Sequence, residues 1–279
     1  LSDATPSKIA PGSSIKLVLN IFLMSVIFQI FGFISFLFFW DQKIVGNEYG
    51  IVFNALFHSI SSFNGAGFDI LKDNHGGSVG VISYDSAILN ITMILILLGS
   101  IGYPFILELF ANAKLFIQSK YKDIFFTLNF KVIIFGTTII MILGALQFLF
   151  SEWTNLATIG NVSIKEKIIH SIFHSITRTA GFSLIDYNLI HNSTSITTIA
   201  LMFIGGSSLS VAGGIKIGTL SIIIVSLVST IIGKEEVVLF RRTVNRDIIR
   251  RSLIIFIFSI IIIIFSFMII SSFEPDTIF

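Results

Sequence analysis

The stretch that decides the fold is Phe57-His58-Ser59-Ile60-Ser61-Ser62-Phe63-Asn64-Gly65-Ala66-Gly67-Phe68, which recurs as Phe173-His174-Ser175-Ile176-Thr177-Arg178-Thr179-Ala180-Gly181-Phe182. Each copy ends a hydrophobic segment that is too short to cross a membrane. A short helix ending in small residues and glycine can enter a bilayer and turn back, because irregular backbone is tolerated where it lines a water-filled path. Rings of backbone carbonyls replace the hydration shell of alkali cations. The repeat therefore predicts a cation-conducting membrane protein.

The composition is that of a protein with several membrane spans. Of the 279 residues, 54% are hydrophobic and 12% are charged, whereas soluble domains carry roughly 25% charged residues. The absence of cysteine excludes disulfide scaffolds, thiolate metal sites and cysteine nucleophiles. The hydrophobic segments carry no nucleophile–base pair and no acid dyad, so we do not expect an enzyme.

The hydrophobic segments repeat in the order span, short helix, span. About 20 apolar residues cross the hydrocarbon core, and the predicted segments are spans at 17–39, 86–110, 132–150 and 253–270, short helices at 50–62 and 164–177, and an interrupted span at 195–232. The predicted division of the chain is a linker at 1–16, a membrane–pore–membrane unit at 17–114, a second such unit at 115–236 and the first helix of a further unit at 237–279. The fold class is thus an all-α integral membrane protein built from repeated membrane helix–pore helix–membrane helix units, as in potassium channels, with a broken helix in the second unit.

The charges of the loops orient the chain. Loops 111–131 and 233–251 hold ten lysines and arginines, whereas the opposite loops hold four lysines and eight acidic residues. The positive-inside rule makes the first side cytoplasmic. The eight acids of the outer side are Asp41, Glu48, Asp69, Asp73, Asp85, Glu152, Glu166 and Asp186. They are expected to raise the local cation concentration modestly, although each one is as readily explained as ordinary solvated surface.

The two glycine segments are the candidate selectivity filter. Glycine accepts a positive φ and lets the backbone approach a ligand closely, so Gly67 and Gly181 are the sharpest candidates. The predicted ion-binding carbonyls belong to Asn64, Gly65, Ala66, Gly67, Arg178, Thr179, Ala180 and Gly181. We expect Phe68 and Phe182 to pack behind them. Arg178, buried at membrane depth, is expected to donate hydrogen bonds to carbonyls behind the filter, and the alternative is a direct role as a barrier in the pore.

A second candidate element interrupts the 195–232 span for ten residues. A broken helix at membrane depth is tolerated when it lines a cavity or a gate, and ten residues are more than a packing kink needs. Residues 205–214 are therefore predicted to gate the path below the filter, with Lys216 paired, snorkelling or forming an electrostatic barrier. The residues assigned to this gate are Gly205, Gly206, Ser207, Ser208, Gly213, Gly214 and Lys216.

Two histidines stand at metal-ligand spacing. His170 and His174 are separated by one helical turn, but no carboxylate lies between them as the metalloprotease pattern requires. His58 occupies the place of His174 in the first copy of the motif. We therefore predict hydrogen-bonded histidines on pore helices.

These motifs resemble the superfamily of bacterial potassium transporters called TrkH/KtrB, which is related to plant HKT carriers. The resemblance lies in residues 59–68, 98–104, 178–182, 201–208 and 212–216. It implies four membrane–pore–membrane repeats around one pore, of which this chain holds the second, the third and the first helix of the fourth. The first and fourth filters are then expected either from a longer polypeptide or from partner chains. The sequence departs from the family pattern at Leu209, where glycine is usual, and at Val211, where threonine is usual.

The resemblance also implies partners. Members form homodimers in the plasma membrane, bound to a cytosolic ring of nucleotide-binding regulatory subunits, for which loop 233–251 is a plausible contact. No cofactor and no nucleic acid are expected; the lipid bilayer surrounds the chain. The hypothesis is potassium uptake, with sodium coupling or sodium permeability left open. The alternatives are a secondary transporter of another solute and a non-conducting fragment or subunit.

Overall fold

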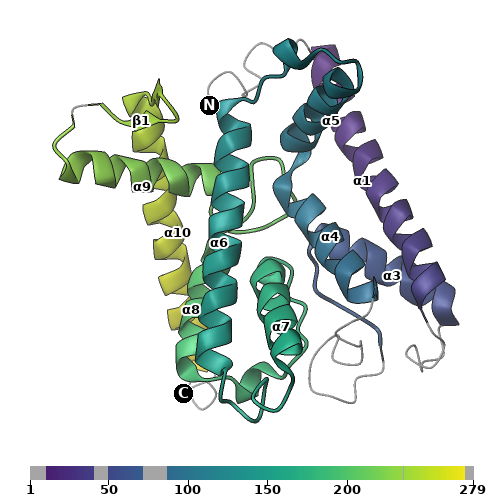
Figure 1. Cartoon of the computed structure of the whole chain (residues 1–279). Coiled ribbons are helices and arrows are strands. Elements are labelled where there is room, and N and C mark those ends of the chain that lie inside the picture. The colour runs from purple at the N-terminus through teal and green to yellow at the C-terminus, as the bar shows by residue number, and fades with distance from the viewer. Residues whose placement is uncertain (1–10, 41–49, 72–86, 235, 274–279) are drawn as a thin grey trace.

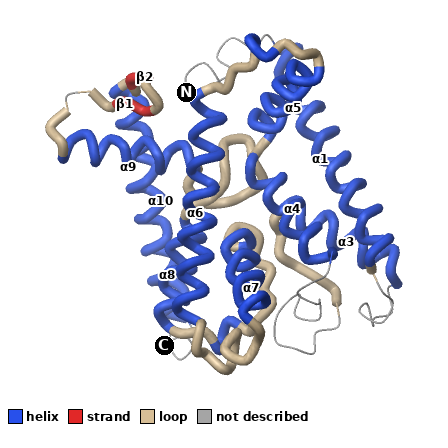
Figure 2. The backbone as a smooth tube through the Cα atoms, in the orientation of Figure 1, coloured by secondary structure: helices blue, strands red, loops and turns tan. Residues whose placement is uncertain are grey.

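The computed structural model describes residues 11–40, 50–71, 87–234 and 236–273, and helices make up almost all of its regular structure (Figures 1 and 2). The elements are α1 (Pro11–Phe39), α3 (Gly50–Asn64), α4 (Ala87–Ile101), α5 (Tyr103–Ile117), η2 (Tyr121–Asp123), α6 (Leu128–Glu152), α7 (Ile164–Thr177), η3 (Tyr187–Leu189), α8 (Asn192–Phe203), α9 (Ile217–Ile231), β1 (Val238–Leu239), β2 (Arg242–Thr243) and α10 (Arg246–Phe273). Strands β1 and β2 form one small antiparallel hairpin. The all-α class predicted from the hydrophobic pattern is confirmed.

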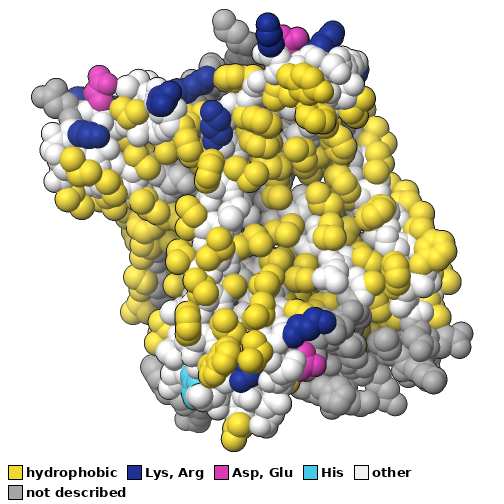
Figure 3. All heavy atoms as spheres, in the orientation of Figure 1, with side chains coloured by type: hydrophobic (Ala, Val, Ile, Leu, Met, Phe, Trp, Pro, Cys, Tyr) yellow, Lys and Arg dark blue, Asp and Glu magenta, His cyan; other side chains and the backbone are white. Residues whose placement is uncertain are grey.

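Among the described residues, three helices are long and apolar enough to cross a membrane by themselves. They are α1 from Ile15, α6 and α10, and all three begin at the same end of the molecule (Figure 1). Helix α1 begins at Pro11 and not at 17 as predicted, because proline is well tolerated in a first helical turn. Apolar side chains cover the middle of the visible face, while lysines and arginines gather mainly at one edge (Figure 3). A band of this kind suits a bilayer.

The two predicted short helices are present. Helix α3 covers the predicted 50–62 and two further residues, and α7 has the predicted bounds. Ser163 and Glu166 form a capping box at the start of α7, which satisfies two backbone N–H groups that the helix leaves free. Both short helices lie at the same end of the molecule, beside the C-terminal halves of α1 and α6 (Figure 1).

The serine of the Phe-His-Ser motif attaches each short helix to the span before it. Ser59 Oγ donates to the carbonyl oxygen of Gln29 on α1 at 2.5 Å. Ser175 Oγ donates in the same way to Met141 on α6 at 2.7 Å. A serine hydroxyl needs such a partner when it is buried in an apolar setting. The repeated motif therefore fixes the same helix–helix contact twice.

A glycine on each span makes room for that serine. A Cβ at Gly32 would lie 2.6 Å from Ser59 Oγ, and a Cβ at Gly144 would lie 2.5 Å from Ser175 Oγ. Small residues are how membrane helices approach one another closely. One turn after each glycine, Phe36 and Phe148 pack against the motif histidine of the same unit. The sequence reasoning missed these glycines, although Gly-x-x-x-Phe occurs once in each span.

The predicted span at 86–110 is wrong as a single helix. The chain breaks at Gly102, and α4 and α5 are inclined to each other by 102°. Gly102 has φ +86° and Pro104 lies in the first turn of α5, so the sequence both permits the sharp turn and starts a new helix after it. The segment is thus two separate helices with a sharp bend between them.

The interrupted hydrophobic segment 195–232 also consists of two separate helices. Residues 204–216 connect α8 to α9. Helix α9, with 15 residues, is too short to span, and it runs across α6 (Figure 1). Ile217 at its start fills the space that a side chain at Gly136 of α6 would need.

The two units share one core. Phe36 of α1 and Leu95 of α4 belong to the same buried cluster as Phe173 of α7, Ala180 and Phe182. All five are at most 3% exposed. The end of the second glycine motif is therefore built into the first unit, and this packing brings the two motifs together.

Candidate functional site

The two glycine motifs turn the backbone at the ends of α3 and α7. Gly65, Gly67 and Gly181 have φ of +63°, +75° and +85°. Side-chain-bearing residues rarely adopt such values. Each motif thus leaves its helix as irregular chain, as the sequence predicts.

The two motifs lie against each other. The space that a Cβ on Gly67 would occupy is filled by the carbonyl oxygen of Ala180, and Gly181 Cα lies 2.9 Å from that point. A Cβ on Gly65 would lie 3.4 Å from the carbonyl oxygen of Thr179. Backbone therefore meets backbone between the two units, and a glycine stands where the approach is closest.

The carbonyls of these segments are not used by secondary structure. In the described parts of the chain, no residue donates a hydrogen bond to the carbonyl oxygens of residues 64–67 or 178–181. The turns are held by neighbouring groups instead: Ala66 N donates to Ser61 O at 2.9 Å, and Gly181 N donates to Thr177 O at 2.8 Å. Carbonyl oxygens that the fold leaves available are the kind of ligand an alkali cation accepts.

The two phenylalanines that follow the glycines differ in their surroundings. Phe182 is 1% exposed, and its ring lies 5.1 Å from that of His58 on α3. Phe68 is 72% exposed among the described residues. The predicted packing is thus seen for Phe182, whereas for Phe68 it is not. The phenylalanine of the second unit packs on the short helix of the first.

The motif histidines make hydrogen bonds, as predicted. His58 Nε2 lies 2.9 Å from Thr92 Oγ1, and His174 Nδ1 lies 3.1 Å from Tyr187 Oη. Burial raises the pKa of Tyr187 to about 12, so its hydroxyl stays protonated at neutral pH. No group of three metal-binding side chains was found among the described residues.

Arg178 follows the last residue of α7 and is 8% exposed. The expected hydrogen bonds to carbonyls behind the glycine segments are not seen, and its Nε has no partner among the residues described. A buried guanidinium is costly unless it is paired. Arg178 is therefore a buried residue at the start of the second glycine segment.

The predicted gating loop is a compact structure closed at its base. Gly205 N donates to Ile215 O and Ile215 N donates to Phe203 O, both at 2.9 Å. The carbonyl of Gly213 fills the place of a side chain at Gly205, and Gly214 has φ +72°. The glycines of the loop are thus required by its close backbone contacts.

The loop contacts both the broken helix of the first unit and its own start. Gly206 lies against Ser100 of α4, and a Cβ on Gly206 would collide with the carbonyl oxygen of Ser100. Lys216 Nζ donates to Ala212 O at 2.6 Å, so this lysine is paired within the loop, which is one of its three predicted roles. The described residues therefore place the loop against the end of α4, where Val211 N donates to Gly99 O at 3.1 Å. The Cβ position of Gly99 is filled by the carbonyl oxygen of Phe63.

A buried carboxylate organises the outer connections. Glu152, counted above among the outer acids, is fully buried and cannot act as surface charge. It accepts hydrogen bonds from the hydroxyls of Thr194 and Thr158, the side chain of Asn155 and the backbone N–H of His191. This network ties the end of α6 to the start of α8. Asp41, Glu48, Asp73 and Asp85 lie outside the described residues.

A membrane protein whose short helices bring two glycine-ended segments together belongs to the class of re-entrant pore-helix transport proteins. The chain is a member of the TrkH family, described as "Cation transport protein", whose model matches residues 10–275. It is an integral protein of the plasma membrane. The family consists of cation transporters, so the expectation that the chain is not an enzyme is confirmed.

Three known proteins illustrate the relationship. The Ktr system potassium uptake protein B of Bacillus subtilis (strain 168) is 33% identical over 210 residues, which cover 75% of this chain and 44% of that protein. The potassium/sodium uptake protein NtpJ of Enterococcus hirae is 30% identical over 258 residues, covering 92% of this chain and 54% of that protein. The crystal structure of the potassium transporter TrkH from Vibrio parahaemolyticus matches with a TM-score of 0.65 at 17% identity, over 90% of this chain and 50% of that one. The chain spans about half the length of the curated relatives it matches.

Proposed function

We propose that the chain supplies two filter-bearing units of a potassium uptake protein. In this proposal residues 17–114 and 115–236 are the second and third repeats of the family, and residues 237–279 begin the fourth. The carbonyls of residues 64–67 and 178–181 bind potassium, and residues 205–214 gate the path. The observation that carries the proposal is the contact of Gly67 with Ala180 and Gly181, which brings two glycine-ended segments from different units to one place.

The names of the relatives support potassium as the ion and leave sodium open. Two of the relatives described above are potassium or potassium/sodium uptake proteins by name. Sodium would be a coupling ion or a second permeant ion of the same filter. A homodimer, bound on its cytoplasmic side to a ring of nucleotide-binding subunits, is the assembly that we propose. The basic loop 233–251, part of which is the β1–β2 hairpin, is the proposed contact for that ring.

Uptake of isotope-labelled rubidium into vesicles that contain the protein tests this function, with potassium and sodium as competitors. We expect saturable uptake that potassium blocks more effectively than sodium. Gly181→Ser places a side chain at φ +85° next to Gly67 and should weaken potassium uptake or selectivity. Unchanged potassium affinity in that variant, within a protein that holds all of its filter segments, would overturn the assignment. Uptake of another solute without cation competition would favour a secondary transporter instead.

A further inference from the structure

The break between α4 and α5 leaves backbone groups at two helix ends that need hydrogen-bond partners. The last carbonyls of a helix and the first N–H groups of the next have no partners within their own helices. In a membrane each such group must be satisfied by protein or by water in a cavity. The break at Gly102 therefore needs partners from elsewhere.

Loop 204–216 of the second unit supplies partners for the carbonyl side of this break. Ser207 N donates to Ser100 O at 3.0 Å, and Val211 N donates to Gly99 O at 3.1 Å. The Ser207 hydroxyl also donates to Ile101 O. Three consecutive carbonyls at the end of α4 are thus capped by the loop.

The same loop also accepts a hydrogen bond from the first N–H group of α5. Tyr103 N, the first N–H of α5, donates to Leu209 O at 3.3 Å. The following residue is Pro104, which has no N–H, and Ile106 N donates to Gly102 O at 3.4 Å. No side chain caps α5. The loop thus takes the place of a conventional N-cap residue.

Gly102 makes this close approach possible. A Cβ on it would collide with the Ser207 hydroxyl and lie 2.7 Å from Ser208 O and 3.2 Å from Leu209 O. Its φ of +86° would also strain any other residue. Alanine at Gly102 would therefore push the loop away from the break.

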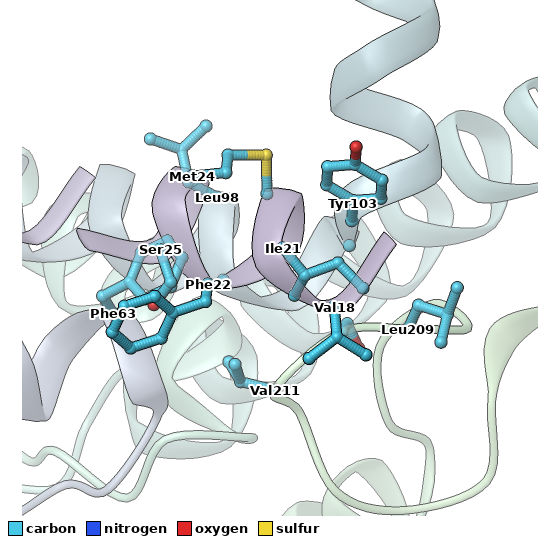
Figure 4. A pocket seen from close by; sticks show the side chains of 13 residues that line it. Val18, Ile21, Phe22, Met24, Ser25, Phe63, Leu98, Tyr103, Leu209 and Val211 are labelled. Carbon is cyan, nitrogen blue, oxygen red and sulfur yellow. The ribbon is translucent and has the colours of Figure 1, made fainter. Parts of the chain in front are cut away.

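Two apolar side chains of the loop are packed loosely. Leu209 and Val211 face a cavity of about 300 Å³ whose other walls include Val18 and Phe22 of α1 and Tyr103 of α5 (Figure 4). Leu209 is 54% exposed within the described structure. In the tip of the loop, residues 207–211, the buried side chain is that of Ser207, at 1% exposure. Hydrogen bonds to the break, more than apolar packing, therefore hold the tip.

We propose that the α4–α5 break is the seat of the gating loop in its closed position, and that Ser207 and Gly102 are positioning residues that hold it there. This inference rests on the proposed function. When the loop leaves, four backbone groups of α4 and α5 lose their partners, so water must enter or the two helices must change their bend. Movement of the loop is thereby coupled to a change at the α4–α5 break, although the loop and the two helices belong to different units of the chain.

The variants Ser207→Ala and Gly102→Ala test the seat in the full polypeptide. Ser207→Ala removes one hydrogen bond and should shift the closed–open equilibrium about fivefold toward open; Gly102→Ala should shift it at least as far. Ser259→Ala is the matched control, because it also removes a hydroxyl-to-carbonyl bond, at 2.8 Å to Ile255 O on α10, far along the chain from the loop. A rise in the maximal uptake rate with an unchanged half-saturating potassium concentration would separate a gating effect from a filter effect.

A second readout does not depend on transport. Residues 1–279 contain no cysteine, so Ala212→Cys, at a position 5% exposed in the seated loop, gives a single labelling site within them; any cysteine elsewhere in the full polypeptide is first replaced by serine. Modification by a water-soluble methanethiosulfonate should be about fivefold faster when Ser207→Ala or Gly102→Ala is added, and unchanged with Ser259→Ala. Equal labelling rates and equal uptake in all variants would overturn the proposal. Faster labelling in a protein without potassium-blocked uptake would uphold the seat and refute the proposed function.

Discussion

Alanine at Gly67 is the substitution that tests the contact between the two glycine segments. The Cβ that it adds would collide with the carbonyl oxygen of Ala180, and would lie 2.9 Å from Gly181 Cα. The backbone at this position also has φ +75°. The variant therefore has to relieve both a strained conformation and a collision with the other segment.

Alanine at Gly181 provides a comparison, because it would have the same backbone strain but would not collide with the other segment. Its φ is +85°, and the nearest atom to an added Cβ is Gly67 Cα at 3.8 Å. Left-handed backbone costs a residue with a side chain roughly 1–2 kcal/mol, which corresponds to about 5- to 30-fold in an equilibrium constant. Overpacking adds about 1–3 kcal/mol, so Gly67→Ala should cost about 2–5 kcal/mol, or thirtyfold and more.

The assay is competition of potassium with rubidium uptake. The potassium concentration that gives half-maximal competition reports the part of this free-energy cost that weakens ion binding. Gly218→Ala on α9 is the control, since no atom lies within 4 Å of the added Cβ and its φ is not positive. We expect the half-saturating concentration to increase in the order Gly218→Ala, Gly181→Ala, Gly67→Ala. Either of two results would refute the reasoning: Gly67→Ala behaving like Gly218→Ala, or Gly181→Ala being the more damaging of the two filter variants.

Four further variants probe the rest of the account. Thr194→Val leaves the buried carboxylate of Glu152 with one hydrogen bond fewer and should lower the free energy of unfolding by about 1–3 kcal/mol; an unchanged thermal midpoint would argue against that network. Phe182→Ala should cost about 3–5 kcal/mol and Phe68→Ala much less, because only the former is buried in this chain; equal losses in chemical denaturation would contradict this packing. Leu209 has φ +56°, so Leu209→Gly should leave stability unchanged or raise it by about 1 kcal/mol, and a clear loss would count against the loop conformation.

The short helices were predictable because their signals are local. Ser163 and Glu166 mark the start of α7 by a capping box, and the glycine motifs mark the ends of α3 and α7. The serine contacts with α1 and α6 were not predicted, because their partners Gln29 and Met141 lie about 30 residues earlier in the chain. Pattern and capping chemistry thus define elements well when the physical cause lies within a few residues.

The failures lie where the cause is distant in the chain. Gly102 and Pro104 allow either a kink or a complete break. In the structure the helices bend by 102°, and residues 204–216 dock on the helix ends that the bend exposes. Hydropathy cannot distinguish the two, because α4 and α5 are both apolar. Glu152 shows the same limit, since its partners Thr158 and Thr194 come together only in the folded chain.

The most direct test of the central claim is to locate a bound ion. Crystals of the protein grown in rubidium, measured at the rubidium absorption edge, would show the ion by its anomalous signal. The account predicts a peak in contact with carbonyl oxygens of residues 64–67 and 178–181, which potassium displaces and which Gly67→Ala abolishes. A rubidium peak elsewhere in the membrane-spanning part, with none at these carbonyls, would contradict it.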